Sequence, residues 1–184
     1  MSVAAHLNVE LKARCADPAR VRAVLEDAGA EFRGVDEQRD VYFRVPRGRL
    51  KLRRGTLERA LIHYERANAA EVKPSRVTLS RLERAGEAAL DDLEGTLTAA
   101  LGVRMVVVKR REIRFVGNVK FHLDEVPGLG AFVEIEAIES DGASGEPALR
   151  AQCEAWRMRL GLAESDLVAE SYSDLVSSSP RRHP

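Results

Sequence analysis

The segment His6–Arg14, HLNVELKAR, alternates apolar and polar side chains along its whole length. Such alternation is typical of a β-strand with one buried face and one polar face, because successive side chains point to opposite sides. The polar face of this strand holds an amide, an acid and two bases, namely Asn8, Glu10, Lys12 and Arg14. Either it is ordinary solvent-exposed surface, or it is the wall of a site that holds an anion together with a metal ion.

The length and the charge balance of the chain limit its organisation and its partners. With 184 residues, 45% of them hydrophobic and 32% charged, it has the composition of a folded globular protein. Its length predicts one domain over residues 1–176, followed by a short tail at 177–184. The 29 basic and 29 acidic residues cancel, which argues against a nucleic-acid partner, because nucleic-acid-binding proteins carry a basic excess or stripe.

The sequence also supports expectations about location and thiols. It has no apolar run of the roughly 18 residues that a membrane helix needs, and its first strand stands where a signal peptide would need an apolar core. We therefore expect a cytoplasmic protein with no membrane partner. Cys15 and Cys153 lack the spacing of metal ligands and are interpreted as reduced structural thiols. An exposed strand or helix face could support a homodimer.

Hydrophobic periodicity and turn residues predict the other elements. Three main helices are expected at 18–28, 87–101 and 147–160, and a short segment at 170–176 is expected to dock on the body. Strands are expected at 6–14, 40–45, 49–54, 60–66, 75–82, 104–115, 118–126 and 131–139. Short turns such as Pro46-Arg47-Gly48 join most consecutive strands, so these strands are antiparallel and the chain is of the α+β class.

Nearly every predicted strand has one apolar face and one charged face. A solvent-exposed outer surface would give the same alternation in any single strand. The predicted helices, however, have apolar stripes that need burial against the apolar side of the sheet. A sheet of about eight twisted strands that curls toward closure can then turn its charged faces inward, which predicts a barrel with a polar lumen.

The signs of the charges are sorted among the strands. Cations lie on the middle strands, at Lys51, Arg53, Arg66, Lys109 and Arg111, and carboxylates lie on the first and last two strands, at Glu10, Asp124, Glu134 and Glu136. Ion pairs buried only for stability barely recover their desolvation energy, so a ligand explains the pattern better. A triphosphate facing the cations, with Mg²⁺ or Mn²⁺ held by the acidic oxygens, fits both groups.

The whole pattern resembles a known family. The resemblance lies in NVELKAR, DVYFRVPRGRLKLR, HYER, VVVKRREIR, HLDEVPGLGAFVEIEA and SYSDL, which together span nearly the whole chain. The strongest of these is the run 122–136, where an acid, a glycine-rich turn and a Glu-x-Glu strand follow one another. The sequence resembles the CYTH family, also called the triphosphate tunnel metalloenzymes, and within it the class IV adenylate cyclase branch. This resemblance implies an eight-stranded antiparallel closed tunnel, with the helices packed outside, that binds a triphosphate and a divalent metal.

The resemblance also implies roles for individual residues. The expected metal ligands are Glu10, Asp124, Glu134 and Glu136, and the expected catalytic group is Glu10, Lys12, Glu134 and Glu136. The expected triphosphate contacts are Lys12, Lys51, Arg53, Arg66, Arg76, Lys109 and Arg111, of which Arg66 and Arg76 match the family pattern only loosely. The sequence departs from the family's ExExK signature at its first position, where Asn8 replaces a glutamate. An amide has no charge and cannot act as a base near neutral pH, so Asn8 favours a single-metal arrangement.

The resemblance leaves the reaction open between two chemistries and a third alternative. In a cyclase, the 3′-hydroxyl of ATP attacks the α-phosphorus and pyrophosphate leaves. In a triphosphatase, water attacks the γ-phosphorus of thiamine triphosphate, inorganic triphosphate or a nucleotide. The third alternative is a binding module for polyphosphate or nucleotides that has lost catalysis at Asn8. The detailed resemblance favours the cyclase.

Overall fold

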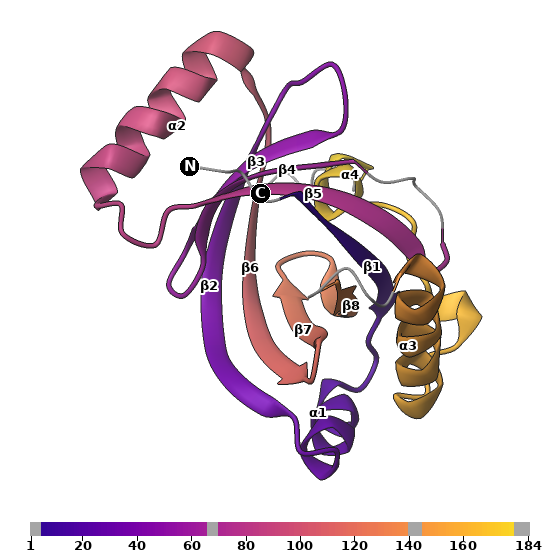
Figure 1. The fold of residues 1–184 in the computed structure, drawn as a ribbon. Coiled ribbons are helices and arrows are strands. Elements are labelled where there is room, and N and C mark those ends of the chain that lie inside the picture. The colour runs from indigo at the N-terminus through magenta and orange to yellow at the C-terminus, as the bar shows by residue number, and fades with distance from the viewer. Residues whose placement is uncertain (1–4, 66–69, 140–144, 179–184) are drawn as a thin grey trace.

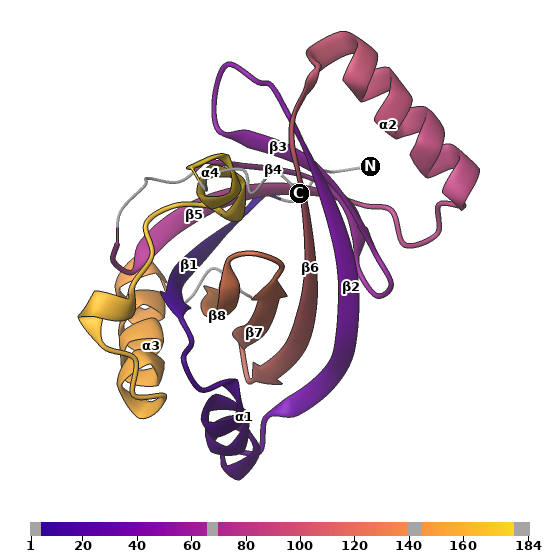
Figure 2. The same ribbon diagram turned by 180° about the vertical axis from the view of Figure 1, so that it is seen from behind.

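Eight strands close into one antiparallel barrel in the computed structural model, which describes residues 5–65, 70–139 and 145–178 (Figures 1 and 2). The order around the barrel is β1-β5-β4-β3-β2-β6-β7-β8, and β8 pairs with β1 to complete it. The strands are β1 (Ala5–Arg14), β2 (Glu31–Phe43), β3 (Arg49–Gly55), β4 (Arg59–Glu65), β5 (Lys73–Arg81), β6 (Val103–Val116), β7 (Val119–Val126) and β8 (Gly130–Ile138). The predicted closed antiparallel tunnel is therefore confirmed.

The helices lie outside this barrel or at its end. They are α1 (Pro18–Asp27), α2 (Glu87–Leu101), α3 (Gly145–Arg159), the 3₁₀ turn η1 (Glu164–Asp166) and α4 (Tyr172–Ser178). Asp17 caps α1 by accepting a hydrogen bond from the backbone N–H of Arg20, and Pro18 opens the helix, as the sequence predicts. In the described part of the chain, no helix is both long and apolar enough to cross a membrane.

Strand β2 is longer than the sequence predicts. It begins at Glu31 rather than at Asp40, because its first half pairs with the long strand β6 from Glu31 opposite Phe115 onward. Gly34, with a φ of 128°, lies where the β2–β6 register shifts, a conformation that favours glycine. The first half of β2 is mostly polar and has no alternation of apolar residues, so periodicity could not reveal it.

The largest hydrophobic core lies outside the barrel, under α1 and α3. These helices bury Leu25, Leu149 and Cys153 against the outer face of β1, β7 and β8. Phe121 of β7 meets Trp156 of α3 edge to face, with ring centroids 4.8 Å apart. Because burial on this side satisfies the apolar face of the strands, their charged face is left to point inward.

A second apolar cluster joins α2 to the outer face of β2 and β3. Leu90 is fully buried against Val41 and Leu52 there. Charged contacts at the edge add to this packing, since Arg39 makes a two-pronged ion pair with Glu94 at 2.7 and 2.9 Å. In Figure 1, α2 therefore stands on the opposite side of the barrel from α3.

The C-terminal segment is anchored at one end of the barrel. Asp174 of α4 pairs with Arg49 at the start of β3 (2.7 Å) and with Arg104 near the start of β6 (2.6 Å). These contacts place Ser171 and Tyr172 against the lumen, where both line its cavity. Tyr172 also packs edge to face on Phe132, with centroids 5.2 Å apart.

Candidate active site in the barrel lumen

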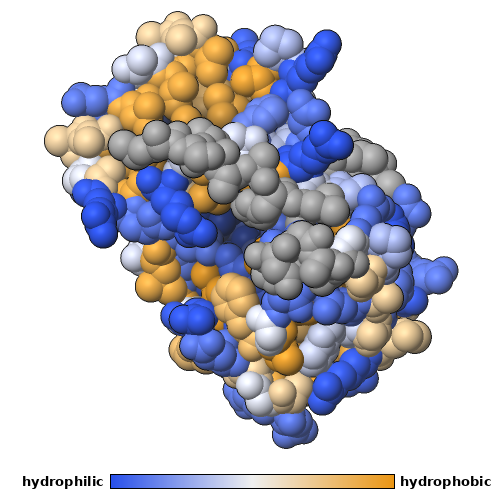
Figure 3. Space-filling model, in the orientation of Figure 1, coloured by the Kyte–Doolittle hydropathy of each residue, from blue (hydrophilic) through white to orange (hydrophobic). Residues whose placement is uncertain are grey.

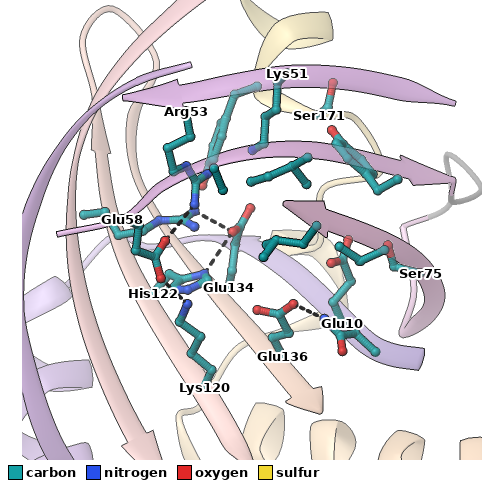
Figure 4. A pocket seen from close by; sticks show the side chains of 18 of the residues that line it. Glu10, Lys51, Arg53, Glu58, Ser75, Lys120, His122, Glu134, Glu136 and Ser171 are labelled. Atoms are coloured by element: carbon teal, nitrogen blue, oxygen red, sulfur yellow. Dashed lines mark hydrogen bonds and ion pairs between the residues drawn. The ribbon is translucent and has the colours of Figure 1, made fainter. Parts of the chain in front are cut away.

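The barrel encloses a cavity of about 220 Å³ that is lined from all eight strands. Most strands turn alternate side chains into it, so residues two apart in sequence lie side by side on its wall. Figure 4 shows these side chains converging from opposite strands, and Figure 3 shows hydrophilic residues around a recess in the middle of the molecule. The polar face of HLNVELKAR is thus the wall of a site, because Asn8, Glu10 and Lys12 all line the cavity.

The wall divides into three sectors by chemistry. The cationic sector consists of Lys51 and Arg53 on β3 with Lys109 and Arg111 on β6. The acidic sector consists of Glu10 on β1 with Glu134 and Glu136 on β8. The third, mixed sector lies on β4 and β5 and consists of Arg59, Ala60, Ile62, Tyr64, Ser75, Val77, Leu79 and Arg81. Anion-binding and oxygen-donor groups therefore lie on different parts of one enclosed wall.

Asp40 holds one half of the cationic sector and forms the Asp40 cluster with Lys51 and Arg53. It is 1% exposed and accepts bonds from Lys51 Nζ at 2.9 Å and from Arg53 Nε and Nη2 at 2.9 and 3.0 Å. Burial alone would raise the pKa of Asp40, but the charges of Arg53 and Lys51 outweigh it and hold that pKa well below its usual range. Burial, with the charge of Arg53, lowers the pKa of Lys51 to about 8.

Asp124 holds the other half and forms the Asp124 cluster with Lys109 and Arg111. Arg111 donates to both carboxylate oxygens of Asp124, with Nε to Oδ1 at 2.6 Å. Lys109 Nζ lies 3.7 Å from Asp124 Oδ2. The hydroxyl of Tyr172 donates to Asp124 Oδ2 at 2.6 Å. Burial opposes ionisation of Asp124, yet Arg111 and Lys109 bring its pKa down to about 2.

This placement gives Asp124 partners that its predicted role as a metal ligand does not include. The sequence suggested a metal ligand, but Asp124 is 1% exposed, lies behind the cavity wall and has its oxygens occupied by Arg111 and Tyr172. The physical reason is the β6–β7 register, which sets Asp124 directly opposite Arg111. In this structure Asp124 positions the cations, as Asp40 does on the other hairpin.

Lys12 and Glu134 connect the acidic and cationic sectors. They are paired in the β1–β8 register, and Lys12 Nζ lies 3.3 Å from Glu134 Oε1. Arg111 Nη2 reaches Glu134 Oε2 at 2.6 Å, and His122 Nδ1 lies 3.3 Å from the same oxygen. Burial opposes ionisation of Glu134, but Arg111 and Lys12 hold its pKa well below the usual range. Lys12 Nζ also lies 3.7 Å from the ring centroid of Tyr172.

Glu10 and Glu136 face one another in the β1–β8 register. Burial raises the pKa of Glu136, and the nearby charge of Glu10 adds to the increase. Asn8 Nδ2 donates to Glu136 Oε1. The residue that departs from the family signature is therefore a hydrogen-bond donor to one of the expected metal ligands.

The donor set on this side of the lumen fits Mg²⁺ or Mn²⁺. Both ions prefer hard oxygen ligands, and Mg²⁺ is usually held by one or two carboxylates together with substrate phosphates and water. Among the described residues, no three His, Cys, Asp or Glu side chains are gathered as a ready-made metal site. Glu10 and Glu136 would be the two carboxylates of such a site, and the remaining ligands would come from the substrate and from water.

Two predicted triphosphate contacts are not brought to the cavity. Arg76 is exposed on the outer face of β5, because its neighbours Ser75 and Val77 are the side chains that point inward. Arg76 therefore lies on the opposite face of the strand from the one that its predicted role requires. Arg66 lies outside the described residues.

Sequence reasoning missed several residues of the site. Glu58 joins two cations, with Arg53 Nη1 at 2.9 Å and Lys120 Nζ at 2.6 Å, and both Glu58 and Lys120 line the cavity. Glu58 lies in the turn before β4, where no strand alternation could assign it a face. The sequence does hold a signal for Asp40. It is two residues from Tyr42 on the same strand, so the two side chains point to the same face, and Tyr42 lines the cavity.

Comparison with known proteins identifies the family. The family model for the CYTH domain matches residues 6–172, which is most of the chain and all eight strands apart from the first residue of β1. The chain belongs to the CYTH family. Enzymes of this family are adenylate cyclases or triphosphatases that use divalent metals, and the sequence-based assignment to it is confirmed.

Individual relatives show how far the likeness extends. The adenylate cyclase CyaB of Aeromonas hydrophila is 36% identical over 90 residues, which are 48% of this chain and 47% of that protein. This alignment thus spans only about half the length of the curated relative. A Vibrio parahaemolyticus structure, provisionally named an adenylate cyclase, has a TM-score of 0.76 at 22% identity and covers 95% of this chain and 100% of its own.

A more distant structure carries a different activity. The Hippeastrum protein HpAC1, provisionally named an adenylyl cyclase, is described as revealing a dominant triphosphatase activity. It matches with a TM-score of 0.54 at 14% identity, over 93% of each chain. At such identities these two structures show the tunnel fold and do not identify the reaction.

Proposed function

We propose that this CYTH chain is a divalent-metal-dependent enzyme that binds a triphosphate in its lumen, and that its reaction is the conversion of ATP to cyclic AMP and pyrophosphate. The observation that carries the proposal is the enclosed wall on which four buried cations lie beside a separate pair of facing carboxylates. The name of the CyaB relative supports the cyclase over other triphosphate chemistry.

The cationic sector supplies electrostatic stabilisation. A triphosphate carries three to four negative charges, and guanidinium groups bind phosphate oxygens in a two-pronged geometry. Arg53 and Arg111 are already oriented by their aspartates, so little reorganisation is needed when charge moves to the leaving phosphates. Low exposure strengthens each of these contacts, because the surrounding dielectric is low.

The acidic sector supplies oxygen ligands. Glu10 and Glu136 would hold Mg²⁺ or Mn²⁺, which when bound would neutralise phosphate charge and help fix the phosphate chain. In the cyclase reaction a bond forms between the 3′-oxygen and the α-phosphorus while the bond from the α-phosphorus to the bridging oxygen breaks. The leaving group is pyrophosphate, and the 3′-hydroxyl proton passes to solvent or a base. The bond that forms and the bond that breaks must lie in line at the α-phosphorus, a geometry that the enclosed wall would impose.

Hydrolysis is the second candidate. The dominant triphosphatase activity described for the Hippeastrum homologue favours it, since that protein has the same tunnel fold. In that reaction water attacks the terminal phosphorus and orthophosphate leaves, so the same cations and carboxylates would act on the other end of the chain. The two reactions differ in the nucleophile and in which phosphorus is attacked, and therefore in their products.

Product analysis tests the proposal. The purified protein is incubated with Mg²⁺ or Mn²⁺ and ATP, thiamine triphosphate or tripolyphosphate in separate reactions, and products are identified by chromatography and ³¹P NMR. Cyclic AMP with pyrophosphate supports the cyclase, and orthophosphate supports the triphosphatase instead. Binding without any product would contradict both and leave a binding module.

A matched pair of variants ties any turnover to the lumen. Arg53 lines the cavity, whereas its neighbour Arg54 points outward to the acids of α2. Arg53→Ala should remove most of the activity and Arg54→Ala should keep it, because only the first contacts the substrate. Equal loss in both variants would contradict a site in the lumen.

A further inference from the structure

Glu58 joins cations from two opposite walls of the lumen. It lies in the turn directly before β4, and its Oε2 accepts from Arg53 Nη1 at 2.9 Å while its Oε1 accepts from Lys120 Nζ at 2.6 Å. In the order of the eight strands around the barrel, β4 is third and β7, which carries Lys120, is seventh, so these two strands stand on opposite sides. The ion pair of Glu58 with Lys120 therefore crosses the lumen (Figure 4).

The contact with Glu58 uses the part of Arg53 that Asp40 leaves available. Asp40 accepts from Nε and Nη2 of Arg53, so Nη1 is the guanidinium nitrogen that has no bond to Asp40. That nitrogen donates to Glu58. A phosphate that takes its hydrogen bond from Nη1 therefore competes with Glu58 for it.

Exposure separates the two acids that contact Arg53. The side chain of Asp40 is 1% exposed, whereas that of Glu58 is 30% exposed and projects from a turn. Burial would raise the pKa of Glu58, but the charges of Lys120 and Arg53 hold it well below its usual range, so the carboxylate is ionised near neutral pH. Asp40 is thus a fixed support of Arg53, and Glu58 is an anion that a ligand can reach and replace.

Asp36 fixes the backbone from which Glu58 projects. It is buried and accepts hydrogen bonds from the backbone N–H groups of Leu57 at 2.7 Å and Glu58 at 3.2 Å, and from Thr56 Oγ1 at 3.0 Å. Because the turn is held in this way, the carboxylate of Glu58 leaves its two cations by rotation of its own side chain. It stays tethered beside them and so competes at a high effective concentration.

Lys120 extends the row of cations beyond the two aspartate clusters. Its side chain is 15% exposed and lines the cavity. In the β6–β7 register it is paired with Phe115, farther along β6 than Arg111, so it stands beyond the Asp124 cluster on the lumen wall. While Glu58 neutralises it, Lys120 adds little net charge for an incoming phosphate, but once released it is one more cation for the phosphate chain.

We propose that Glu58 is a built-in competitor of the triphosphate, and that Lys120 is a further phosphate contact, gained when the ligand takes the place of the Glu58 carboxylate. The inference rests on the proposed function, because it concerns how a triphosphate reaches the same lumen. A carboxylate carries one negative charge and a phosphate chain carries several, so the exchange favours a polyanion over a singly charged anion. Glu58 is therefore a residue that selects for highly charged ligands.

Removal of the competitor gives an effect whose sign tests the inference. Dissociation constants are measured by calorimetry with Mn²⁺ and bismethylene triphosphate, in which methylene groups replace both bridging oxygens and prevent cleavage. Glu58→Gln keeps the size of the side chain but removes its charge, and it should bind this analogue about tenfold more tightly than the wild type. If Glu58 only positions Arg53, the same variant should bind more weakly.

Two further variants control for loss of charge and for folding. Glu37 is exposed on β2, beside Asp36 in sequence but on the outer face, so Glu37→Gln removes the same charge away from the lumen. It should change the affinity less than about twofold, because exposed charges at a distance are screened. Glu58→Asp keeps the charge but draws it back by one methylene, and it should bind about threefold more tightly than the wild type. Circular dichroism checks that each variant is folded.

A double variant tests Lys120 as a phosphate contact. In the Glu58→Gln background, Lys120 has lost its carboxylate partner, so Lys120→Gln should weaken binding of the analogue about fivefold or more if Lys120 contacts the phosphates. A residue that served only to hold Glu58 would have no effect there. An unchanged affinity would therefore overturn the role of Lys120.

The remaining outcomes separate this inference from the proposed function. Equal or weaker binding by Glu58→Gln would overturn the competitor while leaving a triphosphate site in the lumen. An equal gain in Glu37→Gln would also overturn it, because the effect would then come from net charge alone. Failure of both the wild type and Glu58→Gln to bind the analogue would overturn the proposed function as well.

Discussion

The Asp40 and Asp124 clusters occupy two hairpins whose sequences run in opposite order. Asp40 precedes Arg53 by 13 residues on β2–β3, and Asp124 follows Arg111 by 13 residues on β6–β7. In each hairpin the aspartate faces its arginine directly across the strand pair, and a lysine stands two residues before that arginine. The two clusters therefore present similar pairs of cations to the lumen from different strands.

The clusters differ in what supports them from outside the hairpin. The Asp40 cluster is joined by Glu58, from the turn just after β3. The Asp124 cluster is joined by Tyr172, from the C-terminal segment that Asp174 anchors to the barrel. Glu58 also links the Asp40 cluster to Lys120 of β7, whereas the Asp124 cluster depends on docking of the end of the chain.

The largest expected effect is loss of stability when either aspartate is neutralised. Asp40→Asn and Asp124→Asn should each lower the free energy of unfolding by about 3 kcal/mol, because removing one charge from a buried ion pair leaves the cations uncompensated. Urea denaturation of both variants measures this change. Asp91→Asn, at an exposed partner of Arg54, should cost less than about 1 kcal/mol, and a similar cost at all three positions would contradict the two buried clusters.

Removal of the arginines should weaken substrate binding on both sides of the lumen. Arg53→Ala and Arg111→Ala are each expected to raise the KM for the triphosphate about tenfold or more, because each loses a charge-assisted contact. Steady-state kinetics with Mn²⁺ measures this change. The outward neighbours Arg54 and Arg110 are the matched controls, and an unchanged KM in either lumen variant would remove that cluster from the site.

The link to the C-terminal segment should affect one cluster only. Tyr172→Phe removes the hydroxyl that donates to Asp124 and should reduce the free energy of unfolding by about 1.5 kcal/mol. In double variants, this loss of unfolding free energy should add to the loss caused by Arg53→Ala. It should not add fully to the loss caused by Arg111→Ala, because the hydroxyl and Arg111 act on the same carboxylate. Simple additivity with both arginine variants would show that Tyr172 does not support the Asp124 cluster.

The smallest expected effect is a pH dependence that comes from Lys51 of the Asp40 cluster. Burial lowers the pKa of free Lys51 to about 8, and a bound triphosphate should raise it by attraction. Binding then takes up a proton, so affinity should fall about fivefold between pH 8 and 9 as free Lys51 loses its charge. Lys51→Arg keeps its charge over this range and should bind with a flatter pH profile, and identical profiles would contradict the role of Lys51.

The sequence predicted the fold well because the barrel depends on alternation. Strand β1 could be assigned from Val9 and Leu11 on one face and Glu10 and Lys12 on the other, and the helix at 87–101 has the bounds that its leucine spacing predicts. The first half of β2 was missed, because its pairing with β6 is set by register and not by an apolar pattern of its own.

The site was predicted in part, for a related reason. Face parity placed Lys51, Arg53, Lys109 and Arg111 together in the lumen, where the structure has them. It could not say which acid pairs with which base, since that depends on the register between strands. The pairing of Asp124 with Arg111 was therefore not predicted and Asp40 was overlooked, although the two aspartates make equivalent contacts.

A crystal structure with a methylene-bridged ATP analogue and Mn²⁺ would test the central claim most directly. We expect the three phosphates to lie in the lumen between the Asp40 and Asp124 clusters, in contact with Arg53 and Arg111, and an anomalous manganese signal at Glu10 and Glu136. Phosphates bound outside the barrel, with the contacts of both arginines unchanged, would contradict the account.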